Sequence, residues 1–257
     1  MAAPARANDQ SVSGLSDEER ALRVELAAAH RLAEKYGMAE LIYTHISLRV
    51  PGSPPSYLFK PHQLLFDEVT ASNLVRVDLH GNIVSQSRPE YRVNPAGTGI
   101  HGALLEARPD INCVFHTHSP YAVAVSSLDC GLLPLTQASM RFNGQLAYHD
   151  YAGAAVTDVE RTRLAEDFGD NSVMLMKNHG VLATGATVGE AFIAAFYMEK
   201  ACEFQILAQS SGQSLTMPMV EQRNRVSRGP ERLSGRNDDA WPALIRMLDR
   251  EDPSYKD

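Results

Sequence analysis

The chain has 257 residues, of which 44% are hydrophobic and 21% charged, as in a globular protein with one large domain or a domain and an extension. Its net charge of −7, with no run of more than two adjacent Lys or Arg residues, argues against a surface that binds nucleic acid. No apolar run reaches the roughly 18 residues that cross a bilayer. Three scattered cysteines without a CxxC spacing favour reduced thiols. We expect a cytoplasmic protein that binds a small-molecule substrate and neither nucleic acid nor a membrane.

The N-terminal region is predicted to combine a tail and a helix. Residues 1–15 are rich in small and polar side chains and lack the apolar stretch of a secretory signal, which predicts a disordered tail. Ser16 with Glu19 fits a capping box, and apolar residues then recur at helical spacing until Gly37 offers a C-cap. These signals predict a first helix between Ser16 and Gly37.

The next stretch of the chain has the features of strands. Apolar and β-branched residues alternate or cluster in residues 44–50, 56–61 and 74–84, between breaks that contain Pro or Gly. Residues 99–107 are long enough for a helix, which the Arg-Pro-Asp sequence at 108–110 would end. We therefore predict strands and hairpin turns followed by a helix.

The second half of the chain alternates the two kinds of element. We predict strands over residues 111–119, 172–177 and 180–185, and helices over 157–169 and 187–209. The last helix opens with a second capping box, Thr187 and Glu190, and its small and apolar residues exceed one stripe, which indicates burial on several sides. Residues 212–257 are predicted to be an extension with a short helix near Trp241 that docks on the domain or on a partner subunit.

Several predicted strands follow one another through short turns, although helices are interspersed with them. This order favours a mixed or antiparallel sheet over a doubly wound parallel one. The predicted fold class is α/β, a three-layer α/β/α sandwich with a mixed, mostly antiparallel sheet, formed by residues 16–211.

The sequence VFHTHSP, residues 114–120, carries two histidines in a predicted strand. Side chains alternate along a strand, so His116 and His118 lie on one face with Cα atoms about 6.5–7 Å apart, close enough to converge on one cation. His179, in an Asn-His-Gly turn between two predicted strands, is the best third ligand. Three imidazoles would leave open positions on Zn²⁺, Fe²⁺ or Mn²⁺, as catalytic sites do. A structural pair of core histidines is the alternative.

Longer stretches resemble the class II aldolase/adducin family, which includes fuculose-phosphate aldolase, ribulose-phosphate 4-epimerase and the head domain of adducin. The resemblance covers residues 18–209 and rests on YTHISLRVPG, YLFKPHQLLFDEVTASNLVRVDLHGNIV, NPAGTGIHGALLEARPDINCVFHTHSP, CGLLPLTQ, YHDY and LMKNHGVLATGATVGEAFIAAFYMEKACEFQ. It implies the class II aldolase-like sandwich and metal ligation by His116, His118 and His179. It also implies that the metal acts as a Lewis acid on a hydroxy-carbonyl group, and that the protein forms a cyclic homotetramer.

The chain departs from the family pattern at two places. The glutamate that usually completes the metal site and moves the proton is replaced by Gly97 in NPAG. The G-N-x-S phosphate motif of the sugar-phosphate aldolases reads Thr44-His45-Ile46-Ser47 here, and KPHQLLFDE replaces the second phosphate loop. The resemblance is therefore nearest to the adducin-like branch, and we expect a substrate without phosphate.

Other residues must then supply the acid/base group. The candidates that could take or give a proton near the metal, besides metal-bound hydroxide, are His45, His62, His101, Tyr148 and His149. We predict catalytic roles for His45, His101 and Tyr148, and expect Tyr148 and His149 in any case to brace a turn. The predicted substrate contacts are His45, Lys60, His62 and Gly97. Lys60 or Arg141 could receive a substrate carboxylate.

Three functions are compatible with these residues. The leading hypothesis is a divalent-metal-dependent lyase, with zinc as the first choice of metal, that cleaves a C–C bond of a nonphosphorylated hydroxy- or oxo-acid by decarboxylation or retro-aldol reaction. A non-haem Fe(II) oxygenase could use the same three histidines. A noncatalytic adducin-like scaffold is the third, which the short tail ending in REDPSYKD disfavours.

Overall fold

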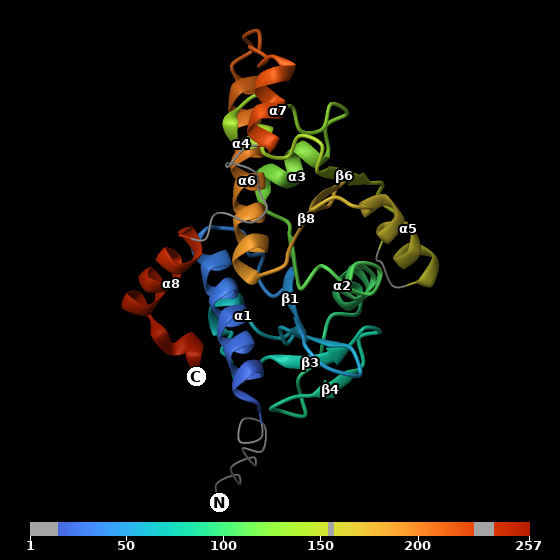
Figure 1. The fold of residues 1–257 in the computed structure, drawn as a ribbon, viewed down its shortest axis with the longest axis vertical. Helices are drawn as coiled ribbons and strands as arrows, with labels where there is room; N and C mark the ends of the chain where they lie inside the picture. The colour runs from blue at the N-terminus through green and yellow to red at the C-terminus, as the bar shows by residue number, and fades with distance from the viewer. Residues whose placement is uncertain (1–14, 154–156, 229–238) are drawn as a thin grey trace, which may run out of the picture.

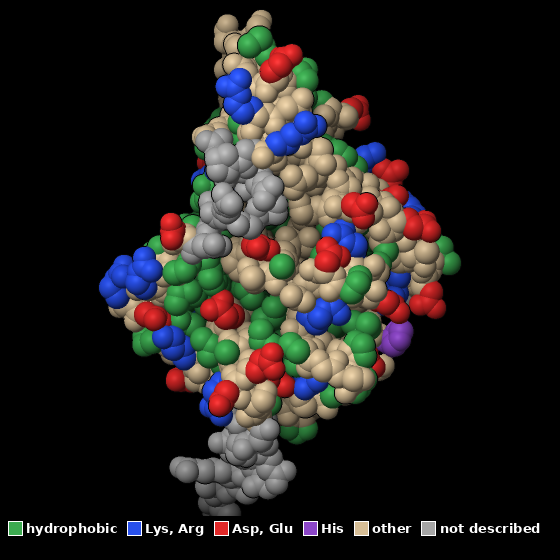
Figure 2. All heavy atoms as spheres, viewed as in Figure 1, with side chains coloured by type: hydrophobic (Ala, Val, Ile, Leu, Met, Phe, Trp, Pro, Cys, Tyr) green, Lys and Arg blue, Asp and Glu red, His purple; other side chains and the backbone are tan. Residues whose placement is uncertain are grey.

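The computed structural model describes residues 15–153, 157–228 and 239–257, so the predicted tail at residues 1–15 lies outside the described residues except for Leu15. The described part is an α/β sandwich around one eight-stranded sheet, as predicted (Figure 1). None of its helices is long and apolar enough to span a bilayer. On the face in Figure 2, acidic and basic side chains are mixed over the surface.

The sheet has the strand order β4-β3-β2-β1-β5-β8-β7-β6. Its strands are β1 (His45–Val50), β2 (Ser56–Phe59), β3 (Val75–Asp78), β4 (Ile83–Ser85), β5 (Cys113–Thr117), β6 (Leu146–His149), β7 (Val173–Met176) and β8 (Gly180–Gly185). All neighbours pair antiparallel except β6 and β7, which pair parallel. The prediction of a mixed, mostly antiparallel sheet is therefore confirmed.

Helices cover both faces of the sheet. They are α1 (Asp17–Lys35), α2 (Pro95–Ala107), α3 (Pro120–Ser126), α4 (Gln137–Met140), α5 (Asp158–Phe168), α6 (Val188–Ser210), α7 (Val220–Arg228) and α8 (Ala240–Glu251), with 3₁₀ turns at Phe66–Glu68 and Pro253–Lys256. One core cluster joins α1, α3 and α6 to the sheet, and the other joins α2 and α5 to its opposite face. Figure 1 shows the two groups on opposite sides of β1 and β8.

Alternation along β1 and β5 divides their residues between the two cores. Ile46 and Phe115 point into the core under α1 and α6, whereas Val114 points into the core under α2. His45 and His116 occupy opposite positions on the paired strands. The period of two therefore places both histidines on the α2 side of the sheet.

The two predicted capping boxes are half formed. The Ser16 and Thr187 hydroxyls accept the backbone N–H of the residue three positions on, as predicted. The carboxylate of Glu19 instead binds Arg23 and Arg76, and that of Glu190 accepts the N–H of Ala186. Each helix start is thus fixed by its hydroxyl residue, while the glutamate ties the helix to a neighbouring segment.

The C-terminal residues dock on α1. Trp241 packs on Phe192 of α6, and its Nε1 donates to Glu25 at 2.6 Å. Tyr255 is fully buried, and its carbonyl accepts the N–H of Ala71 at 2.9 Å. The C-terminal extension thus packs on the domain of its own chain, one of the two docking places that we predicted.

Four elements were not predicted: α3, α4, α7 and β6. Tyr148 and His149 both lie on β6, with His149 opposite Met176 of β7. The Tyr148 hydroxyl holds the turn before Leu132, as expected, whereas His149 binds side chains of α5. The first helix, the hairpin strands and the long helix α6 agree with the prediction.

Candidate metal centre

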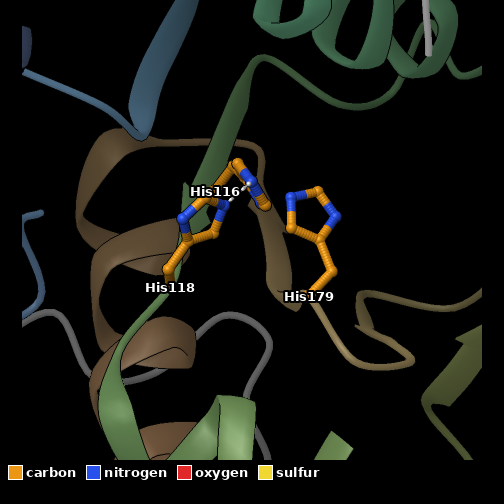
Figure 3. A group of neighbouring side chains, drawn as sticks. All are labelled: His116, His118 and His179. Carbon is orange, nitrogen blue, oxygen red and sulfur yellow. Dashed lines mark hydrogen bonds between the residues drawn. The ribbon is translucent and has the colours of Figure 1, made fainter. Parts of the chain in front are cut away.

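Three histidines from distant parts of the sequence converge at the end of β5. His116 lies on β5, His118 directly follows that strand, and His179 lies in the turn between β7 and β8. Their ring centroids are 4.7 to 4.9 Å apart, and one nitrogen from each can lie within 4.8 Å of the others. Figure 3 shows the His179 ring facing the other two. The predicted ligand set is thus assembled, although β5 ends one residue before His118.

The turn that carries His179 is fitted closely to β5. Asn178 adopts a left-handed conformation with φ of 57°, which asparagine tolerates better than most residues. A Cβ atom at Gly180 would lie 2.4 Å from the carbonyl oxygen of Thr117 and 3.2 Å from the His118 ring. Only glycine therefore lets β8 begin this close to the Thr117 backbone, which explains the glycine of the Asn-His-Gly sequence.

Hydrogen bonds to Nδ1 orient two of the rings. His116 Nδ1 donates to the carbonyl of Val181 at 3.0 Å, and His118 Nδ1 donates to the carboxylate of Glu40 at 2.6 Å. Their Nε2 atoms then face each other 3.0 Å apart. Two nitrogens bound to one tetrahedral zinc ion at about 2.0–2.1 Å lie about 3.3 Å from each other. This spacing fits a shared cation, and carboxylate or carbonyl partners on the remote nitrogen are usual for metal-binding histidines.

The protonation of the rings also fits a metal. Burial, reinforced by His45 and the other two rings, holds the pKa of His116 well below its usual value. Burial lowers the pKa of His179 to about 4. Both imidazoles are therefore neutral at pH 7, the form that binds metals. Nδ1 of His179 is buried with no hydrogen-bond partner in the described part of the chain, so this ring still has an unused polar atom.

Glu40 was not identified from the sequence. It lies in a turn after α1 and is joined to His118 only through the fold, 78 residues away along the chain. Leu41 and Thr44 in the same turn have φ of 49° and 61°. With Asn178, these are the non-glycine residues with left-handed backbones among those described, and all three flank residues of this centre. Such strain concentrates at functional sites.

Lys60 holds this turn rather than facing a substrate. Its side chain is buried, and the ammonium group donates to the carbonyls of Ile42, Pro61 and Leu64 at 2.9, 3.2 and 2.6 Å. Burial lowers its pKa to about 8. The predicted substrate contact disagrees with this geometry, because all three N–H donors are already used. The Thr117 hydroxyl also donates to the carbonyl of Met38, which fixes the start of the same segment.

A second histidine pair borders the centre. The His45 ring stacks on His116 with centroids 5.2 Å apart, and its Nδ1 is 2.9 Å from Nε2 of His101. His101 Nδ1 is 2.6 Å from the Ser47 hydroxyl. A Cβ atom at Gly97 would lie 2.4, 2.6 and 2.9 Å from three atoms of the His45 ring. The imidazole of His45 thus occupies the space into which a side chain at position 97 would extend.

The remaining predicted residues lie outside the histidine cluster. The His62 ring packs near the Tyr43 ring, with centroids 5.9 Å apart, and burial lowers the pKa of His62. The Tyr148 hydroxyl accepts the N–H of Leu132 at 3.0 Å, beside a pocket of about 510 Å³ that Lys177 and Asn178 also line. His149 binds Asp167 and Glu160 through its two nitrogens, and Arg141 stacks on Tyr197. Tyr148 and His149 therefore hold the β6 region together.

Comparison with known proteins agrees with the fold. Residues 24–206 match the family described as the Class II Aldolase and Adducin N-terminal domain. An aldolase II superfamily protein from Pseudomonas syringae has a similar structure, with a TM-score of 0.88, 43% identity, and 95% of this chain and 98% of that chain covered. L-fuculose 1-phosphate aldolase from Glaciozyma antarctica gives a TM-score of 0.84 at 25% identity, covering 100% and 97% of the two chains.

Alpha-adducin from Rattus norvegicus is 38% identical over 245 residues, which are 90% of this chain and 33% of adducin. The chain thus spans about a third of adducin's length. The protein belongs to the class II aldolase and adducin family. The membership, together with the three-histidine cluster, supports a metal-dependent lyase as the class of enzyme.

Proposed function

We propose that the protein is a divalent-metal-dependent lyase that breaks a C–C bond of a nonphosphorylated hydroxy- or oxo-acid, by decarboxylation or retro-aldol cleavage. His116, His118 and His179 are the proposed ligands, and zinc is the proposed metal. The convergence of these three side chains carries the proposal. The bound ion would supply Lewis-acid polarisation of a substrate oxygen.

The chain's own residues supply the rest of this chemistry. The fixed Nδ1 partners of His116 and His118 hold two rings in place before any substrate binds, so little reorganisation is needed. His45, on the buried side of the cluster, is the proposed group that contacts substrate, with His101 behind it. No described carboxylate belongs to the cluster, so a reaction that depends little on a carboxylate base is favoured.

Metal analysis tests the ligand set. Protein purified without added metal or chelator should contain nearly stoichiometric metal, and His116→Ala and His179→Ala should lose it. His80→Ala is the matched control, because His80 is exposed on the β3–β4 turn. A parent protein that neither contains nor takes up metal would refute the proposal and leave the adducin-like scaffold as the function.

Turnover separates the enzyme classes. The metal-loaded protein should release carbon dioxide or an aldehyde from at least one member of a panel of hydroxy- and oxo-acids. The lack of a carboxylate in the cluster also favours a second candidate, a non-haem Fe(II) oxygenase. Substrate-dependent oxygen uptake that requires iron would establish the oxygenase and refute the lyase.

The proposed assembly is a homotetramer in the cytoplasm. The end of the molecule formed by α4, α6 and α7 projects from the sandwich (Figure 1). Phe204 and Leu207 on α6 are 42% and 54% exposed there, and Met219 and Val220 nearby are also exposed. Apolar side chains on a projecting element suit contact with another subunit. Light scattering should give a tetramer, and a monomer would refute this assembly. The three free cysteines agree with a reducing compartment.

A further inference from the structure

A hydrogen-bonded chain of three side chains runs from the core to the edge of the histidine cluster. Ser47 on β1 is 2.6 Å from His101 Nδ1, and His101 Nε2 is 2.9 Å from His45 Nδ1. Ser47 and His101 are fully buried, whereas His45 keeps 5% of its surface exposed. No described residue hydrogen-bonds to His45 Nε2. This series of hydrogen bonds therefore ends at one nitrogen without a partner, Nε2 of His45, beside His116.

The rings of His45 and His101 are both buried, and no described carboxylate hydrogen-bonds to either of them. Burying a charged ring without an ion partner is unfavourable, so each imidazole is neutral. A neutral imidazole carries one N–H, so only two arrangements of protons satisfy the two contacts. Either each side chain donates outward from Ser47 to His101 to His45, or each donates inward from His45 to His101 to Ser47.

The Ser47 hydroxyl decides between the two arrangements. His101 is its only hydrogen-bond partner in the part of the chain that the structure describes. In the inward arrangement Ser47 would accept from His101 and leave its own buried O–H without an acceptor, which is unfavourable by about 1–3 kcal/mol. In the outward arrangement the fully buried donors of Ser47 and His101 both have acceptors, and the one N–H without a protein partner is that of His45, the residue that keeps some exposure. The outward arrangement places the proton of His45 on Nε2.

We propose that Ser47 and His101 fix His45 as a neutral hydrogen-bond donor, whose Nε2–H binds an oxygen of a carboxylate or oxo group held at the His116, His118 and His179 centre. Gly97 leaves room for the His45 ring, because any side chain at that position would overlap it. The inference rests on the proposed function for its substrate class. A neutral imidazole that donates to an oxygen can stabilise charge that develops there without itself gaining a proton.

The proton positions can be measured without substrate or metal. Nitrogen-15 spectra of histidine-labelled protein near pH 7.5 report the tautomer of each ring. His45 and His101 should both be neutral with the proton on Nε2, and Ser47→Ala should remove that preference. Ser85→Ala is the control, since Ser85 lies exposed on the edge strand β4. Finding the His45 proton on Nδ1, or a charged ring, would overturn the proposal.

Oxalate tests the donor role, because it is a chelating dicarboxylate that does not undergo the proposed cleavage. Zinc-loaded His45→Phe, which keeps a ring beside Gly97, should bind oxalate at least tenfold more weakly than the parent, as expected for a lost hydrogen bond to a charged group. The oxalate affinity of zinc-loaded Ser47→Ala should lie between those of the parent and His45→Phe. Equal oxalate affinity in all three proteins would overturn the donor role. Failure of the parent to bind zinc would refute the proposed function and the donor role together. The nitrogen spectra would still show whether Ser47 and His101 fix the proton of His45.

Discussion

The contact between Glu40 and His118 leads to a quantitative prediction for metal affinity. Glu40 accepts from His118 Nδ1 at 2.6 Å, and its side chain is 51% exposed. Hydrogen bonds to charged groups contribute about 1.5–3 kcal/mol when well shielded, and loss of such a partner typically weakens metal binding by about 10–100-fold. Because solvent screens this carboxylate, we expect Glu40→Ala to weaken metal binding by about tenfold, at the lower end of that range.

Glu40→Gln should weaken binding less, because its amide oxygen can still accept from Nδ1. Loss of the charge alone corresponds to about 1 kcal/mol, or about fivefold. The expected order of zinc affinity is therefore parent, then Gln, then Ala. Competition with a chelator of known affinity would give these ratios at fixed pH and salt.

Glu34→Ala and Glu34→Gln are matched controls, because Glu34 is exposed in the last turn of α1. They should bind zinc as the parent does. Melting of the metal-free proteins would show whether any loss comes from unfolding instead. If Glu40→Ala kept the affinity of Glu34→Ala, the argument that Glu40 orients a metal ligand would be refuted.

Two further predictions concern stability. Burial lowers the pKa of His30 to about 3. As the pH falls below 6.5, the unfolded chain therefore binds a proton at His30 that the folded protein does not bind. The free energy of unfolding should fall by about 2–3 kcal/mol by pH 4.5 for this reason. Denaturant unfolding of His30→Leu should show a shallower decline with acid, and an unchanged decline would contradict the assignment. Gly180→Ala, whose Cβ would lie 2.4 Å from the Thr117 carbonyl, should destabilise the protein by about 1–3 kcal/mol and weaken zinc binding. A variant with the parent's midpoint and affinity would show that β5 and β8 separate easily.

The sequence predicts the cluster of three histidines well because its signals are local. Two residues of separation in a strand direct His116 and His118 to one place, and Asn178 and Gly180 have backbone properties that mark the His179 turn. The strands with period-two patterns were found for the same reason. Motif resemblance then placed His45 and Gly97 near the centre. The structure adds that the His45 ring fills the space that a side chain at position 97 would need.

Residues whose role depends on distant contacts were not predictable. Glu40 belongs to the centre only because α1 ends where β5 ends, and Lys60 has no local signal that its donors meet three carbonyls. Strand β6 is short and pairs parallel with β7, so its partner lies beyond a helix in the sequence. His118 lies just past β5, a boundary that depends on pairing rather than on composition.

The left-handed backbones at Leu41 and Thr44 have a consequence for protein engineering. Each such conformation is unfavourable by about 1–2 kcal/mol for a residue with a side chain, and glycine would relieve it. A campaign that ranks variants by melting temperature alone would therefore favour changes in the turn that presents Glu40 and leads into His45. Stability and activity commonly oppose each other at such positions. Selection for thermal resistance in this fold should score metal retention in parallel.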